Sequence, residues 1–294
     1  MGKALFTSVN GNMMGLHGGA MFGNAPKALW QKWTRADDKN MINIASRCLL
    51  VETGSSNILF ETGVGAYLSP AMKARFGVKG ETHELLVALK KLGLDPGEIT
   101  HVILSHLHFD HAGGLLAGFQ EDGELELVFP NADFITGRAN FERSSSPHVR
   151  DRASFIPELN RLLLASNRLF LKEHGDLLVI DNIEIRFIES NGHTPGMLLS
   201  HIRCDEGTLV FAGDIAPGHL WVNLPITMGY DRFPEELVNE KEVILKEVYD
   251  ENSWFFYTHD PVFSISKLAI DPKNGRFIPT GLTETFVRKT LAGI

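Results

Sequence analysis

The segment Ser105-His106-Leu107-His108-Phe109-Asp110-His111 carries four potential metal-binding side chains within six positions. It follows Val102-Ile103-Leu104, a short apolar run between polar residues, which is typical of a buried strand. In an extended segment the first two histidines and the aspartate alternate to one face, and His111 turns toward that face where a helix begins. This pattern predicts a ligand-binding loop at the end of a strand in an α/β protein.

A divalent metal ion explains this loop better than structural histidines do. For any one histidine taken alone, the alternative is a surface position or a buried ring satisfied by the backbone. Three imidazoles and a carboxylate in one short loop are more readily explained by a cation that holds the imidazoles deprotonated. The chain has 12 histidines and only 2 cysteines, so the expected ligands are nitrogen and oxygen.

Three further segments place a histidine or an aspartate where a predicted strand ends. They are residues 191–196 with His193, the pair Gly213-Asp214, and the triplet Thr258-His259-Asp260. Each is weak evidence alone, because an aspartate after a strand is common in turns. Together with the histidine-rich loop they supply potential ligands from four strand ends.

Short strands alternate with helical patterns, which predicts a layered α/β architecture. Strands are expected at 41–52, 57–61, 102–104, 132–136, 177–180, 183–188, 197–203, 208–212 and 254–258. Helices are expected at 82–92, 155–166 and 235–249, and a solvated helix or loop at 138–153. Periodicity is weak before residue 41 and over the last 25 residues, so no element is predicted there. We expect a single domain over residues 1–294, built of two similar halves.

The bulk composition excludes several classes of protein. Apolar residues make up 44% and charged residues 22% of the 294 residues, as in ordinary globular chains. With 28 basic and 36 acidic residues the net charge is −8, which argues against a nucleic-acid partner. The sequence has no secretory apolar region and no run of about 18 apolar residues, which predicts a cytoplasmic protein with no membrane partner.

The order of these motifs resembles that of the metallo-β-lactamase-fold hydrolases over nearly the whole chain. Within that superfamily the chain is most similar to the branch of quorum-quenching N-acyl-homoserine lactonases. The supporting segments are 18–23 (Gly-Gly-Ala-Met-Phe-Gly), Pro26-Lys27, 108–112, Tyr230-Asp231 and Phe233-Pro234. The resemblance implies an αβ/βα sandwich, in which two mixed sheets pack face to face with helices outside.

The resemblance also implies the metal ligands and the chemistry. The first of two divalent ions would be held by His106, His108 and His193, the second by Asp110, His111 and His259, with Asp214 bridging both. Zn²⁺ suits these ligands best, and Mn²⁺, Fe²⁺ and Co²⁺ are compatible. A hydroxide shared by the two ions would attack a carbonyl carbon, and Asp110 would pass a proton to the leaving group. The implied substrate is a small ester or lactone, above all an N-acyl homoserine lactone.

Two positions depart from the family's pattern. Lactonases of this type carry a tyrosine three residues after the bridging aspartate, where this chain has Pro217. His219 or Tyr230 could take its place against the substrate carbonyl, so His219 is a second candidate catalytic residue; a loop histidine without function is the alternative. The other departure is Glu61, where the family usually has aspartate, and its extra methylene could alter hydrogen bonding around the ligands.

An apolar pocket for an acyl chain is expected beside the metals. Its candidate residues are Met21, Phe22, Phe109, Trp221 and Tyr230, with Trp30, Trp33 and Met228 as further options. Ordinary core packing is the alternative for each apolar side chain.

Other functions are compatible with the same sequence. A phosphotriester, phosphodiester or thioester hydrolase would use the same ligands. A mononuclear iron dioxygenase shares the HxHxDH pattern, and a metal-stabilised binding protein would need no reaction at all. A homodimer is also possible.

Overall fold

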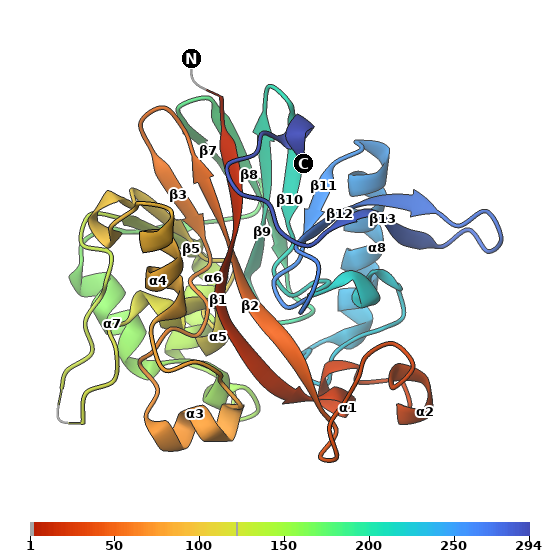
Figure 1. Cartoon of the computed structure of the whole chain (residues 1–294), viewed down its shortest axis with the longest axis horizontal. Helices are drawn as coiled ribbons and strands as arrows, with labels where there is room; N and C mark the ends of the chain where they lie inside the picture. Colours follow the sequence, from red (N-terminus) through yellow and green to blue (C-terminus); the bar gives the residue numbers. More distant parts are fainter. Residues whose placement is uncertain (1–2, 122) are drawn as a thin grey trace.

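Two β-sheets pack face to face between outer helices in the computed structural model of the chain (Figure 1). The structure describes residues 3–121 and 123–294. The first sheet has the strand order β1-β2-β3-β4-β5-β6, and the second has the order β13-β12-β11-β10-β9-β8-β7. This arrangement confirms the predicted αβ/βα sandwich of two mixed sheets.

The first sheet is antiparallel at one edge and parallel toward the other. Its strands are β1 (Leu5–His17), β2 (Met41–Glu52), β3 (Asn57–Phe60), β4 (His101–Ile103), β5 (Asp133–Gly137) and β6 (Leu169–Lys172). The pairs from β1 to β3 are antiparallel, and those from β3 to β6 are parallel. The ends of β3, β4 and β5 therefore point in one direction.

The second sheet is antiparallel except at its centre. Its strands are β7 (Leu177–Ile180), β8 (Ile183–Ser190), β9 (Met197–Cys204), β10 (Gly207–Phe211), β11 (Trp254–Phe256), β12 (Ile265–Ile270) and β13 (Phe277–Thr283). The central pair β10 and β11 is parallel, so these two strands end side by side. Each of these two ends carries one of the predicted ligands, Asp214 and His259.

Helices cover the outer faces of both sheets. The helices of the described residues are α1 (Gly18–Met21), α2 (Lys27–Trp30), α3 (Pro70–Phe76), α4 (Glu84–Lys91), α5 (Phe109–Ala112), α6 (Arg138–Ser145), α7 (Pro157–Ala165) and α8 (Pro234–Asp250). The apolar faces of α4 and α7 pack on the first sheet, and that of α8 packs on the second. Within the described part of the chain, no helix has the length and apolar character needed to cross a membrane.

Burial on both faces explains why the central strands read as continuous apolar runs. In β3, Ile58 and Phe60 point into the layer between the sheets, where Phe60 stacks on Phe211 of β10. Leu59, between them, points outward under α4. Because successive side chains of a strand face opposite ways, a strand with two covered faces needs apolar residues at every position.

The structure confirms the nine predicted strands and three predicted helices within a few residues at their ends. The strands β1 and β13 and the helices α1 and α2 fall in the segments where weak periodicity gave no prediction, and the strands β6 and β12 and the helix α3 were not predicted either. The expectation for 138–153 was wrong in part, because α6 has a buried face that includes Asn140 and Phe141. The Asn140 side chain accepts a hydrogen bond from the backbone of Leu107, which ties α6 to the histidine-rich loop.

Candidate metal centre

The seven predicted ligands meet at the edge where strands of both sheets end. His106 and His108 lie in the loop after β4, and Asp110 and His111 lie on the short helix α5 that follows. His193, Asp214 and His259 follow β8, β10 and β11. We call these seven residues the ligand cluster. One detail of the prediction was wrong: Asp110 lies in the first turn of α5 and not on an extended segment.

Tight glycine packing places α5 against the neighbouring loop. A Cβ atom on Gly114 would lie 2.0 Å from the Thr62 carbonyl oxygen, and one on Gly113 would lie 2.3 Å from that of Val64. The backbone of Thr62 in turn donates a hydrogen bond to the His111 carbonyl. Only glycine permits this approach.

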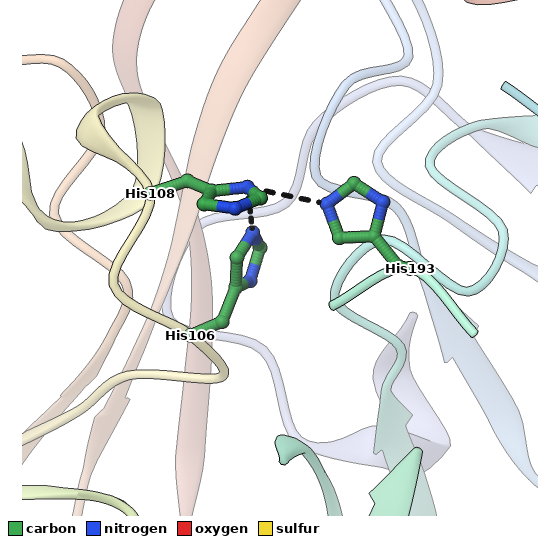
Figure 2. A group of neighbouring side chains, drawn as sticks. All are labelled: His106, His108 and His193. Carbon is green, nitrogen blue, oxygen red and sulfur yellow. Dashed lines mark hydrogen bonds between the residues drawn. The ribbon is translucent and has the colours of Figure 1, made fainter. Parts of the chain in front are cut away.

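Three histidines of the ligand cluster form one compact group (Figure 2). His106 Nε2 lies 3.0 Å from His108 Nδ1, and His193 Nε2 lies 3.3 Å from the same atom. All three side chains are buried. Their nitrogen atoms therefore converge on one point from two different loops.

A second group consists of Asp110, His111 and His259. His259 Nε2 lies 3.1 Å from His111 Nε2 and 3.6 Å from Asp110 Oδ2. The carboxylate of Asp214 lies between the two groups. Its Oδ2 is 3.4 Å from both His111 Nε2 and His193 Nε2, and its Oδ1 is 3.2 Å from His259 Nε2.

Four imidazoles of the ligand cluster have their outer nitrogen held by the protein. His259 Nδ1 donates to the Ala45 carbonyl at 2.7 Å, which fixes its Nε2 toward the second group. His106 Nδ1 lies 2.9 Å from the Ser105 hydroxyl, and His193 Nδ1 lies 2.9 Å from Asp231 Oδ1. Such contacts set the tautomer and orientation of metal-binding histidines.

The outer nitrogen of the fourth, His111, faces a carboxylate that replaces the usual aspartate. His111 Nδ1 lies 3.3 Å from Glu61 Oε2, while Glu61 Oε1 accepts a hydrogen bond from the Ser105 backbone. Glu61 is buried and has a positive φ of 64°, which places its longer side chain under the histidine-rich loop. Glu61 is also close enough to His106 and His111 to be a ligand itself. Its contacts to Ser105 and to the outer nitrogen of His111 favour the supporting role.

The electrostatics of His106, His108 and Asp214 within the ligand cluster fit cation binding. Burial and the neighbouring imidazoles hold the pKa of His106 and of His108 well below the ordinary value, so both rings are neutral. Burial opposes ionisation of Asp214, but the imidazoles of His259, His111 and His193 hold its pKa well below the usual range. Neutral imidazoles and an ionised carboxylate are the forms that bind metals.

An unpaired buried nitrogen supports the same conclusion. His108 Nε2 has no hydrogen-bond partner among the described residues, while its Nδ1 faces nitrogens of two other imidazoles. Facing nitrogen pairs repel unless a proton or a cation lies between them. The two groups and the carboxylate between them are consistent with a dimetal site. The role of each residue as a ligand stays a prediction.

A cavity of about 270 Å³ opens directly on the ligand cluster. Five members of the cluster line it: His108, Asp110, His193, Asp214 and His259. His106 and His111 lie behind them and are fully covered. The walls are mostly apolar, with contributions from Leu16, Ile44, Phe76 and Met228.

The structure divides the predicted pocket residues. Met21, Phe109 and Tyr230 line the cavity. Phe22 and Trp221 do not, because their rings stack on each other at 4.6 Å inside the core. Their aromatic character reflects packing, so these two predictions are corrected to core positions.

His219 lies apart from the cavity, and its catalytic role stays a prediction. It lies outside the residues that line the cavity, and its Nδ1 is hydrogen-bonded to the Asp260 carboxylate. Pro217, at the family's tyrosine position, contributes its carbonyl to the backbone N–H of His259. Of the two candidates for the missing tyrosine, only Tyr230 reaches the described cavity.

Sequence reasoning missed three residues at this site. Asp231 holds His193, and its sole signal was its place in the Tyr230-Asp231 pair. Arg150 and Arg232 line the cavity, and an isolated arginine in a loop carries no recognisable signal.

The histidine-rich cluster at the joined ends of two sandwiched sheets defines a metal-dependent hydrolase. The model of the metallo-beta-lactamase superfamily matches residues 43–259, and the chain belongs to that family.

Individual relatives are more distant. The N-acyl homoserine lactonase of Bacillus cereus is 26% identical over 234 residues, which cover 75% of this chain and 83% of the relative. A probable metal-dependent hydrolase from Staphylococcus aureus superposes with a TM-score of 0.82 at 28% identity, covering 99% of both chains. AidC, a dizinc quorum-quenching lactonase solved with N-hexanoyl-L-homoserine as product, has a TM-score of 0.75 at 20% identity and 95% coverage of both chains.

Proposed function

We propose that the chain is a dinuclear hydrolase that opens lactone rings, with N-acyl homoserine lactones as the leading substrates. One observation carries the proposal: five potential ligands form the floor of a cavity whose walls are mostly apolar. Such a cavity suits a substrate with a reactive carbonyl and an apolar chain. The relatives named N-acyl homoserine lactonase support this substrate class.

Seven residues would hold the two ions. His106, His108 and His193 would bind the first ion, and Asp110, His111 and His259 the second, with Asp214 shared. When bound, a pair of divalent ions supplies a Lewis acid for the carbonyl and lowers the pKa of water toward about 7.

The chain's own residues would orient the substrate and move the proton. Asp110 faces the cavity with a carboxylate that can carry a proton to the leaving alkoxide. Burial, assisted by the charge of Asp110, raises the pKa of Tyr230, so its hydroxyl stays protonated. Tyr230 is therefore a hydrogen-bond donor for the substrate carbonyl, in place of the tyrosine that Pro217 replaces.

The walls would select the acyl group. Met21, Phe109 and Phe76 offer apolar surface beside the ligand cluster, and the Phe76 and Phe109 rings pack at 4.5 Å. Burial of each methylene of an acyl chain contributes about 0.8 kcal/mol. We therefore expect KM to fall as the chain lengthens until the cavity is full.

The test is proton release from a series of N-acyl homoserine lactones of increasing chain length, with zinc-loaded protein. Turnover that depends on chain length is the expected result. No turnover with any member, in protein shown to hold two metals, would contradict the proposal. Parallel assays with chromogenic phosphotriesters, phosphodiesters and thioesters would then identify the alternative hydrolase.

A further inference from the structure

One end of the cavity carries more positive than negative charge. Arg150, Asp151 and Arg232 line this end, and Arg143 lies just behind them. Arg143 donates to Asp151 Oδ2 through Nε at 3.0 Å and Nη2 at 2.6 Å. Because Arg143 already neutralises the single carboxylate, the other two guanidinium groups lack a matching negative charge. We call the three arginines the arginine end.

Arg232 is the unusual member of this group. Only 10% of its side chain is exposed, yet its Nε and Nη1 atoms have no hydrogen-bond partner among the described residues. The nearest carboxylate oxygen, Asp151 Oδ2, is 3.5 Å from Nε and is the atom that Arg143 engages. Burying a guanidinium without partners is unfavourable, so these two atoms require a partner such as a ligand, an ion or an ordered water.

The arginine end is held at a fixed place relative to the ligand cluster. The backbone N–H of Arg232 donates to the His193 carbonyl at 3.1 Å. Arg150 is anchored through one Nη2 bond to the Gly229 carbonyl at 3.1 Å, which leaves its other donors free for a ligand.

The charges favour an anion at this end. Three arginines and Asp151 sum to +2. Asp110 and Asp214 also line the cavity, but two divalent ions would outweigh their charge. The guanidinium fork matches carboxylate and phosphate oxygens in a bidentate manner, and it does so best where water is excluded.

We propose that Arg232 and Arg150 form an anion-binding subsite, and that the preferred substrate is a lactone or ester with a carboxylate or phosphate group. This proposal rests on the proposed hydrolase function and refines its substrate class. Neutral acyl homoserine lactones would use the apolar wall alone. An anionic substrate would span the cavity from the apolar wall to the arginine end.

Matched substrates test the subsite. N-succinyl homoserine lactone ends in a carboxylate, and N-succinamoyl homoserine lactone is its neutral counterpart of nearly equal shape. N-(3-phosphonopropanoyl) homoserine lactone carries a phosphonate in place of the carboxylate, so it shows which of the two anionic groups the subsite prefers. For the zinc-loaded wild type we expect kcat/KM to be about tenfold or more higher for a charged member than for the neutral one.

Variants then assign the effect to Arg232. R232Q should remove the preference for charge, mostly through KM, and leave the neutral lactone within about threefold. Relative to R232Q, R232K should restore part of the preference for charged lactones. A purely structural role of Arg232 does not predict this recovery. R161Q, which alters an exposed arginine on α7, is the matched control and should change nothing.

Two results would overturn the subsite. One is equal kcat/KM for charged and neutral lactones in the wild type, unchanged in R232Q. The other is calorimetric binding of glutarate and inorganic phosphate to the metal-loaded protein that is equally strong in wild type and R232Q, where we expect a loss of about tenfold. The calorimetry needs no turnover, so it tests the subsite even if no lactone is hydrolysed. The absence of hydrolysis would contradict only the proposed function.

Discussion

The floor and the wall of the cavity are built in different ways. The floor consists of residues of the ligand cluster, and four of the five imidazoles in that cluster have the outer nitrogen held by a neighbouring group. The wall is assembled from side chains as far apart in sequence as Leu16 and Arg232. We infer from this difference that the floor would fix the reaction, whereas the wall would select the substrate and could vary without loss of the fold.

The floor should be the most sensitive part of the molecule. D214N keeps the shape of the side chain but removes the charge that lies between the two groups of ligands. We expect lactone hydrolysis to fall on the order of a thousandfold, with loss of at least one metal. Elemental analysis and the proton-release assay measure both effects, with circular dichroism to check the fold. A D214N variant that holds two metals and keeps nearly full activity would contradict the claim that the floor is more sensitive to substitution than the wall.

The groups that support the floor should give the next largest effect. Asp231 holds His193 through Oδ1 and the Met228 backbone through Oδ2. We expect D231N to lower metal affinity by about 10- to 100-fold, because the imidazole loses its fixed orientation. Competition with a chromogenic chelator measures the change. D181N, at an exposed aspartate that also accepts hydrogen bonds, is the control; an equal effect there would deny Asp231 a specific role.

Two phenylalanines allow the wall to be compared with the core, because Phe109 lines the cavity and Phe22 is buried in the core. F109A opens the wall and should raise KM for long-chain lactones by about tenfold, because acyl contacts are lost. F22A removes a fully buried ring and should cost about 3–5 kcal/mol of unfolding free energy, with little change in KM. Steady-state kinetics and denaturant unfolding distinguish the two. Interchanged outcomes would mean that Phe22, and not Phe109, contacts the substrate.

His219 should give the smallest effect. Its ring is hydrogen-bonded to Asp260 outside the cavity lining, so H219Q should leave kcat within about twofold. Steady-state kinetics on the best lactone substrate test this. A tenfold loss of kcat would return His219 to the catalytic residues.

The sequence predicted the floor well and the wall poorly, for physical reasons. His106, His108, Asp110 and His111 are adjacent in sequence, and strand ends gather at one edge of a sheet, so their meeting follows from local pattern. The central strands were also predictable, since burial on both faces requires apolar runs. By contrast, β1 and the β12–β13 pair carry mixed residues, and their pairing depends on distant partners.

The wall depends on tertiary contacts that no local pattern encodes. Phe22 and Phe109 are both aromatic residues in motifs shared with the lactonases, yet one lies in the core and the other in the cavity. Arg232 differs from the exposed arginines only in what surrounds it. The same limit applies to His219, whose partner Asp260 lies 41 positions away in the chain.

Metal titration coupled to turnover tests the central claim most directly. Metal-free protein is titrated with Zn²⁺ while bound metal and lactone hydrolysis are followed together. We predict that hydrolysis rises to a plateau at two ions per chain and is abolished by a chelator. Saturation at one ion, or hydrolysis that persists after both ions are removed, would contradict the dinuclear site.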